Sequence, residues 1–204
     1  MIKLISFDIG GTLVHYTSKS CKLTKLQNLT SLPKEVLLNA IGKHFQSSKE
    51  PLDVMTKNFC AELHLEHLYD EVKEIYSQEN EINLDENTEF IMKELKKRGY
   101  TIITLSNVCY WNCNCSLFET FDKLIDKQIY SFDIGKCKPE KSVFEYVQNL
   151  YNLNPDEIMH IGNSYRADIK PAKEAGWNTI YYTSENIENE VTTNNLVDVL
   201  QLIS

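Results

Sequence analysis

The sequence has no apolar segment that approaches the roughly 18 consecutive residues of a membrane-spanning helix. Its start, Met1-Ile2-Lys3-Leu4, also lacks the long apolar stretch and small-residue cleavage site of a secretory signal. We therefore expect no membrane partner and a cytoplasmic location.

An excess of positive charge and internal repeats are missing as well. The 204 residues carry a formal net charge of −8, which argues against nucleic acid as a partner because such binding depends on a basic surface. The hydrophobic fraction of 42% and the charged fraction of 25% are ordinary for a globular protein. The length suits one large domain or one domain with an inserted lobe.

Six cysteines are present, and Cys109, Cys113 and Cys115 lie close together. Because no secretory signal is visible, we expect reduced thiols. Three clustered thiols can hold a soft metal or form a redox pair, but this spacing matches no standard zinc pattern and has no distant CxxC partner. We favour ordinary loop thiols.

The first apolar run, Leu4-Ile5-Ser6-Phe7, leads directly to Asp8, and Gly10 and Gly11 follow. Such a run predicts a buried strand that ends in a tight turn. In open α/β sheets, ligands bind at the carboxyl edge of the strands, where Asp8 would lie. A carboxylate there can be a covalent nucleophile, as in aspartyl-phosphate enzymes, or can simply cap the next turn.

Strand-like and helix-like segments alternate along most of the chain. This pattern predicts an α/β fold, a Rossmann-like parallel sheet with helices on both faces. Residues 15–84 interrupt the alternation with helical patterns, one of which opens at Pro33. We therefore predict a Rossmann-like core of residues 1–14 and 85–204, and a small all-helical inserted domain of residues 15–84.

Polar groups of different kinds follow the predicted strands or begin the next helix. Asp8, Ser106 and Asp168 come after strand-like runs, and Lys138 precedes a helix. In a doubly wound sheet such loops converge on one crevice. These groups suit phosphoryl transfer, in which Mg²⁺ would bridge Asp8, Asp168 and a phosphate oxygen while Lys138 and Ser106 hold the other oxygens.

Four segments, in this order, resemble the four motifs of the haloacid dehalogenase superfamily. The resemblance extends over essentially the whole chain and implies a magnesium-dependent phosphatase that acts on a small phosphorylated molecule. The segments are Asp8-Ile9-Gly10-Gly11-Thr12-Leu13, Thr104-Leu105-Ser106-Asn107, Gly135-Lys136-Cys137-Lys138-Pro139-Glu140 and Gly162-Asn163-Ser164-Tyr165-Arg166-Ala167-Asp168-Ile169.

The same resemblance implies site residues and a role for the insertion. Residues 15–84 correspond to the helical cap that covers the site in this family and selects substrates. Gly10 is implied as a metal ligand through its backbone carbonyl. A monomer and a homodimer are both compatible with the sequence. The implied catalytic, substrate-binding and metal-binding residues are, in that order, Asp8, Ser106 and Lys138; Gly11, Thr12 and Asn107; and Asp8, Gly10, Asn163 and Asp168.

Two positions depart from the family pattern. Gly10 stands where family phosphatases usually carry a second Asp, which protonates the leaving group and later activates water. Since general acid–base help is typically worth ~10²–10⁴-fold, we expect slow hydrolysis of alkyl phosphates and faster hydrolysis of aryl and acyl phosphates. His15 and Tyr16 are candidate replacement acids, although we favour a surface or packing role for both. Asn163 replaces a common Asp, which predicts weaker magnesium binding.

Other functions stay open. A dehalogenase or a phosphonate hydrolase would depend less on the missing acid; the resemblance implies that the former needs no metal and that the latter uses a Schiff-base lysine of the cap. A mutase is disfavoured because it needs the residue that Gly10 replaces. A catalytically impaired protein that binds a phosphorylated ligand or a partner is the remaining alternative. Lysines of the insertion that are available for this role, none of which stands out, include Lys19, Lys22, Lys25, Lys34, Lys43, Lys49 and Lys57.

Overall fold

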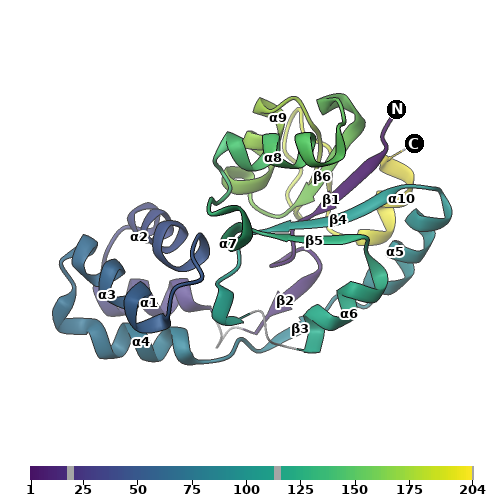
Figure 1. Cartoon of the computed structure of the whole chain (residues 1–204). Coiled ribbons are helices and arrows are strands. Elements are labelled where there is room, and N and C mark those ends of the chain that lie inside the picture. The colour runs from purple at the N-terminus through teal and green to yellow at the C-terminus, as the bar shows by residue number, and fades with distance from the viewer. Residues whose placement is uncertain (18–20, 113–115, 204) are drawn as a thin grey trace.

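A six-stranded parallel sheet forms the centre of the larger lobe in the computed structural model, which describes residues 1–17, 21–112 and 116–203 (Figure 1). The strands lie in the order β5-β4-β1-β6-β7-β8, and every neighbouring pair is parallel. This arrangement confirms the Rossmann-like α/β fold. The strands are β1 (Leu4–Phe7), β4 (Thr101–Ser106), β5 (Lys127–Tyr130), β6 (Ile158–Gly162), β7 (Asn178–Tyr182) and β8 (Thr192–Thr193).

Helices cover both faces of this sheet, because successive side chains of a strand point to opposite faces. Ile5 and Phe7 of β1 pack into the hydrophobic cluster of α5, α6 and α10, whereas Leu4 packs into the cluster of α8 and α9. Figure 1 shows α8 and α9 on one side of the sheet and the other three helices on the opposite side. The helices are α5 (Thr88–Lys97), α6 (Ser116–Leu124), α7 (Ser131–Ile134), α8 (Lys141–Tyr151), α9 (Lys170–Glu174) and α10 (Val199–Leu202).

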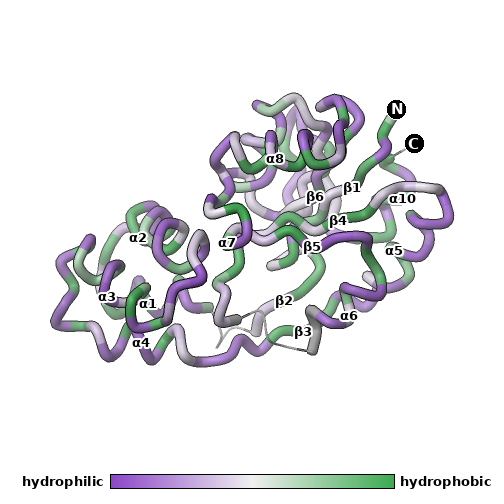
Figure 2. The backbone as a smooth tube through the Cα atoms, viewed as in Figure 1, coloured by the Kyte–Doolittle hydropathy of each residue, from purple (hydrophilic) through white to green (hydrophobic). Residues whose placement is uncertain are grey.

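The segment between β1 and α5 forms a separate helical lobe with its own core. Phe45 stacks on Tyr76 with a ring-centroid distance of 3.6 Å and tilts against Phe59 at 5.2 Å. Figure 2 shows hydrophobic and hydrophilic stretches alternating along these helices, as expected where one face is buried. The helices are α1 (Lys22–Thr30), α2 (Lys34–Ile41), α3 (Leu52–Leu63) and α4 (Tyr69–Ser77).

The chain enters and leaves the helical lobe through an antiparallel ribbon of β2 (Val14–Tyr16) and β3 (Ile82–Leu84). Only helices were expected between residues 15 and 84, so the all-helical prediction for this segment is wrong at its two ends. Two three-residue strands carry too little periodic pattern to be recognised without their partner.

The helical lobe contacts the loops at the carboxyl ends of the sheet strands. The Ser131 hydroxyl donates a 2.5 Å hydrogen bond to the Gln46 carbonyl, and Arg166 forms a 2.8 Å ion pair with Glu35. Ser131 and Arg166 follow β5 and β6, respectively. The lobe therefore lies over the sheet edge at which ligands bind in such folds. Within the described ranges, no helix combines the length and apolar character needed to cross a bilayer.

Candidate active site

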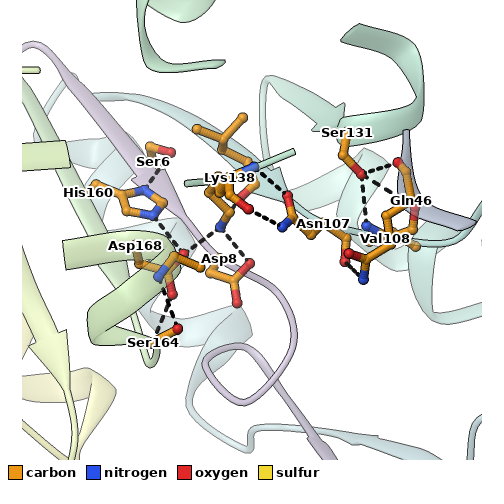
Figure 3. Close-up of polar contacts among 12 residues, drawn as sticks. Ser6, Asp8, Gln46, Asn107, Val108, Ser131, Lys138, His160, Ser164 and Asp168 are labelled. Carbon is orange, nitrogen blue, oxygen red and sulfur yellow. Dashed lines mark hydrogen bonds and ion pairs between the residues drawn. The ribbon is translucent and has the colours of Figure 1, made fainter. Parts of the chain in front are cut away.

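The four sequence segments meet at the carboxyl edge of the central strands. Asp8 follows β1, Ser106 ends β4, and Asp168 lies on a π-helical turn after β6. Lys138 comes from the loop before α8, and its Nζ donates to Asp8 Oδ1 at 2.9 Å, Asp168 Oδ1 at 2.6 Å and the Leu105 carbonyl at 2.7 Å. Figure 3 shows this ammonium between the two carboxylates.

Burial and charge set the protonation of these groups. Lys138, Asp8 and Asp168 expose only 3%, 8% and 1% of their surfaces. Burial raises the pKa of Asp8 against the opposing effect of Lys138. For Asp168, burial alone would also raise the pKa, but Lys138 and His160 outweigh it and hold the pKa well below its usual range. Burial alone would lower the pKa of Lys138, but the two carboxylates raise it, so the ammonium stays charged.

His160 contacts Asp168, and Ser6 in turn contacts His160; sequence reasoning missed both residues. His160 Nε2 lies 3.4 Å from Asp168 Oδ1, and its Nδ1 lies 3.0 Å from the Ser6 hydroxyl (Figure 3). Burial lowers the pKa of His160, and a neutral ring with its proton on Nε2 satisfies both contacts. The signal in the sequence was a titratable residue, His160, inside an otherwise apolar strand. The structure adds that His160 lies in direct register with Ser6 on β1.

Asn107 fixes the position of Lys138. Its side-chain amide donates to the Lys138 carbonyl at 2.8 Å, and its oxygen accepts from the Lys138 backbone N–H at 2.9 Å. The sequence-based role of Asn107 in substrate binding stays a prediction, because these two bonds by themselves describe a positioning residue.

The glycine-rich turn after Asp8 brings Asn163 close to Gly11. Gly11 has a φ of +81°, and a Cβ there would lie 2.1 Å from the Asn163 amide nitrogen, so only glycine fits. Thr12 is fully buried; its backbone N–H donates to the Ile9 carbonyl at 3.2 Å, and its side-chain hydroxyl has no hydrogen-bond partner among the described residues. The predicted substrate contacts of Gly11 and Thr12 remain predictions.

The residues present suit a magnesium ion. Within the described residues, no three His, Cys, Asp or Glu side chains form a metal-binding group. Mg²⁺ nevertheless needs only one or two carboxylates, because it keeps waters and takes phosphate oxygens. Asp8 and Asp168 bond to one ammonium. Gly10 and Asn163 lie on the adjoining turns, so a backbone carbonyl and a side-chain amide oxygen are further candidate ligands.

Two hollows border the site where the helical lobe meets the sheet. One is mostly apolar and holds about 200 Å³, and the other holds about 700 Å³. Both are lined in part by Asn107. The larger hollow is lined by one carboxylate, that of Glu140, and by more cationic side chains, those of Lys43, Lys136, Lys138 and Arg166.

The ammonium of Lys22 lines the smaller hollow and donates to the carbonyls of Tyr76 at 3.3 Å and Gln78 at 2.8 Å. Burial lowers the pKa of Lys22 to about 8, below the value of 10.5 expected for the unfolded chain. Between these two values the unfolded state binds more protons, so this residue makes the unfolding free energy rise with pH.

Lys22→Met should remove this rise. We expect urea unfolding at several pH values between 8 and 10.5 to show a flatter profile for Lys22→Met than for the native chain. Lys34→Met, which changes an exposed lysine, is the matched control and should keep the native slope. Equal slopes for the native chain and Lys22→Met would contradict the assignment.

The cysteine cluster is only partly visible. Cys109 is buried, and burial raises the pKa of its thiol. Cys113 and Cys115 lie outside the described residues, so the preference for ordinary loop thiols stays a prediction.

Comparison with protein-family models gives a match over residues 2–176 to the haloacid dehalogenase-like hydrolases. The chain belongs to this family. This match confirms the family that the four sequence motifs predicted, and the family is one of hydrolases.

The curated relatives of this chain include a phosphatase and another kind of hydrolase. The chain is 23% identical to rat bifunctional epoxide hydrolase 2 over 88% of its own length and 36% of the relative's. It is 28% identical to glyceraldehyde 3-phosphate phosphatase of Methanothermobacter thermautotrophicus over 51% of its own length and 46% of the relative's. The match spans less than half the length of each of these curated relatives.

Solved structures of this haloacid dehalogenase-like fold cover nearly all of the chain. A predicted phosphoglycolate phosphatase from Haemophilus somnus has a TM-score of 0.67 at 20% identity, with 100% of this chain and 98% of that chain covered. A 2-haloacid dehalogenase from Pseudomonas syringae scores 0.66 at 18% identity, with the same coverage. A family enzyme from Bacteroides thetaiotaomicron, solved with magnesium and inorganic phosphate, scores 0.64 at 17% identity and covers 93% and 98%. At these identities the likeness establishes the fold.

Proposed function

We propose that the protein is a magnesium-dependent phosphatase that hydrolyses a small phosphorylated molecule through an aspartyl-phosphate on Asp8. The observation that carries this proposal is the buried ammonium of Lys138, bonded to both Asp8 and Asp168 at the edge of the sheet. The fixed ammonium can bind a phosphate oxygen, and the Asp8 carboxylate beside it is a nucleophile that can attack phosphorus. The phosphatases among the similar proteins agree with this assignment.

Each residue has a proposed task. The Asp8 carboxylate attacks phosphorus, and water later hydrolyses the acyl phosphate. Lys138 and Ser106 bind the non-bridging phosphate oxygens, and Asp168, held by His160 and the Ser164 backbone N–H, keeps the ammonium in place. Bound Mg²⁺, held by Asp8, Asp168, the Gly10 carbonyl and Asn163, would neutralise phosphate charge and reduce its repulsion by Asp8.

We further propose that residues 15–84 act as the cap and that residues 1–14 and 85–204 form the catalytic core. The lobe of α1–α4 contacts the loops that carry the site, and both hollows lie along this contact. A small molecule bound in the larger hollow would touch helical-lobe side chains such as Asn39 as well as Lys138, so the lobe would select the substrate.

The test is turnover of a panel of phosphorylated metabolites and of aryl and acyl phosphates, with Mg²⁺ and with excess EDTA. We expect phosphate release that requires Mg²⁺ and is faster for aryl than for alkyl esters by at least ~10-fold, because a phenolate leaving group is a weaker base than an alkoxide and depends less on an acid.

Other results would support other functions. Chloride release from a 2-chloro acid without metal would replace the phosphatase by a dehalogenase, a class also found among the similar structures. Borohydride trapping of a lysine with a phosphonate substrate would support a phosphonate hydrolase. Binding of phosphorylated ligands without any turnover would make the protein a binding protein.

A further inference from the structure

The hydroxyl of Tyr16 occupies the space beside Gly10, the residue that lacks the acid. A Cβ built on Gly10 would lie 2.8 Å from the Tyr16 Oη and 3.0 Å from its Cε2. Gly10 is two residues beyond Asp8, on the same turn. A side chain from β2 therefore fills the place in which a carboxylate at residue 10 would begin.

Backbone contacts hold this tyrosine against the turn. The Gly11 N–H donates to the Val14 carbonyl at 2.7 Å, which ties the Asp8 turn to the start of β2. Side chains alternate along a strand, so Tyr16 shares a face with Val14, and both line the smaller hollow together with Asn107. His15 points to the opposite face, where it contacts Asp85 at 3.1 Å. The strand thus presents Tyr16, and not His15, to the site.

We propose that Tyr16 is the proton donor to the leaving group, in place of the acid missing at Gly10. The inference rests on the proposed phosphatase function. An exposed fraction of 48% leaves Tyr16 partly open to solvent, which is compatible with contact to a bound substrate. This proposal replaces the surface or packing role that the sequence favoured for Tyr16.

The chemistry balances with water as the second reactant. An Asp8 oxygen bonds to phosphorus as the ester P–O bond breaks, and the leaving oxygen takes the electron pair of that bond and the hydroxyl proton of Tyr16. Water then attacks the phosphorus of the acyl phosphate and gives one proton to the tyrosinate. The products are the alcohol, inorganic phosphate and the original Asp8 and Tyr16.

The test compares benzyl phosphate, whose alkoxide leaving group needs a proton, with 4-nitrophenyl phosphate, whose phenolate does not. Because kcat/KM covers the steps up to release of the alcohol, Tyr16→Phe should lower it at least ~10-fold for benzyl phosphate and less than ~2-fold for 4-nitrophenyl phosphate. Tyr146→Phe, which removes a hydroxyl from the similarly exposed Tyr146 of α8, should change neither value.

Two further measurements keep the proposal falsifiable if Tyr16→Phe folds poorly. The native protein should show a normal solvent deuterium isotope effect on kcat/KM with benzyl phosphate and almost none with 4-nitrophenyl phosphate. Tyr16→Ala leaves room for a side chain at residue 10, so adding Gly10→Asp to it should restore benzyl phosphate hydrolysis.

The outcomes separate the two proposals. Equal losses on both substrates, or no loss on either, would overturn the role of Tyr16 while leaving the phosphatase intact. If the native protein hydrolyses neither ester in the presence of Mg²⁺, the phosphatase proposal fails and the role of Tyr16 fails with it.

Discussion

Replacing Asp8 by Asn lowers phosphate-ester hydrolysis by at least ~10³-fold, because an amide cannot form the acyl phosphate. The substitution keeps the size of the side chain and leaves an oxygen to accept the 2.9 Å hydrogen bond from Lys138. Burial raises the pKa of Asp8, so its charged form is costly in the folded state. We therefore expect Asp8→Asn to unfold at the same temperature as the native chain or at a higher one.

Steady-state rates and thermal unfolding, measured on the same samples, check this prediction. Mass spectrometry after acid quenching should detect a phosphoryl adduct on the native chain and none on Asp8→Asn. Asp156→Asn, at the opposite end of β6, is the matched control and should keep native rates. Undiminished turnover in a folded Asp8→Asn protein would remove Asp8 from the mechanism.

Replacing Lys138 by Met destabilises the metal-free protein by about 3–5 kcal/mol, because one buried charge partner is lost and the others stay. Asp8 and Asp168 would then face each other without the ammonium that now bonds to both. Only 8% of Asp8 and 1% of Asp168 is exposed, so water can solvate their charges very little. The phosphate site would lose its fixed cation as well, so turnover should fall in parallel.

The pH dependence of Lys138→Met follows from the same geometry. Without the ammonium, burial and mutual repulsion raise the pKa of one carboxyl in the folded state. The folded state then binds that proton more tightly than the unfolded state, so stability increases as the pH falls through the raised pKa. Mg²⁺ supplies positive charge to the same oxygens and should raise the unfolding temperature of Lys138→Met more than that of the native chain.

Denaturant unfolding at pH 5 and pH 7.5, with and without Mg²⁺, tests these expectations. The control is Lys136→Met, which changes an exposed lysine two residues away whose Nζ contacts the Ser142 hydroxyl at 3.2 Å. It should alter stability by no more than about 0.5 kcal/mol. Equal stabilities for the two variants would contradict the central role of the buried ammonium.

Helix and strand positions with a long periodic pattern were predictable, and short ones were not. The apolar runs of β1, β4 and β6 and the amphipathic pattern of α5 and α8 identify these elements. Lys127–Tyr130, with one buried side chain, becomes strand β5 only because it pairs with β4 at the edge of the sheet. After β6 a π-helical turn, Tyr165–Ile169, precedes α9, and no residue pattern distinguishes this turn from an ordinary helix.

The motifs located the candidate site residues Asp8, Ser106, Lys138 and Asp168 along the chain. They carried no information about the residues that hold these side chains in place. His160 was hidden in an apolar strand, and its contact with Asp168 depends on the π-helical turn that brings the carboxylate back toward β6. The two hydrogen bonds between the Asn107 amide and the Lys138 backbone were not expected from the motif, and a substrate contact of Asn107 stays a prediction.

The sequence alone was enough to identify the four polar side chains of the candidate site. It also predicted the sheet edge at which they lie, because parallel strands all end on the same side. Which hydroxyl lies beside Gly10 depended on folding, since Tyr16 reaches that place through a turn and a ribbon whose second strand begins 66 residues further along the chain, at Ile82. Contacts between such distant segments depend on packing in three dimensions, and no local pattern encodes them.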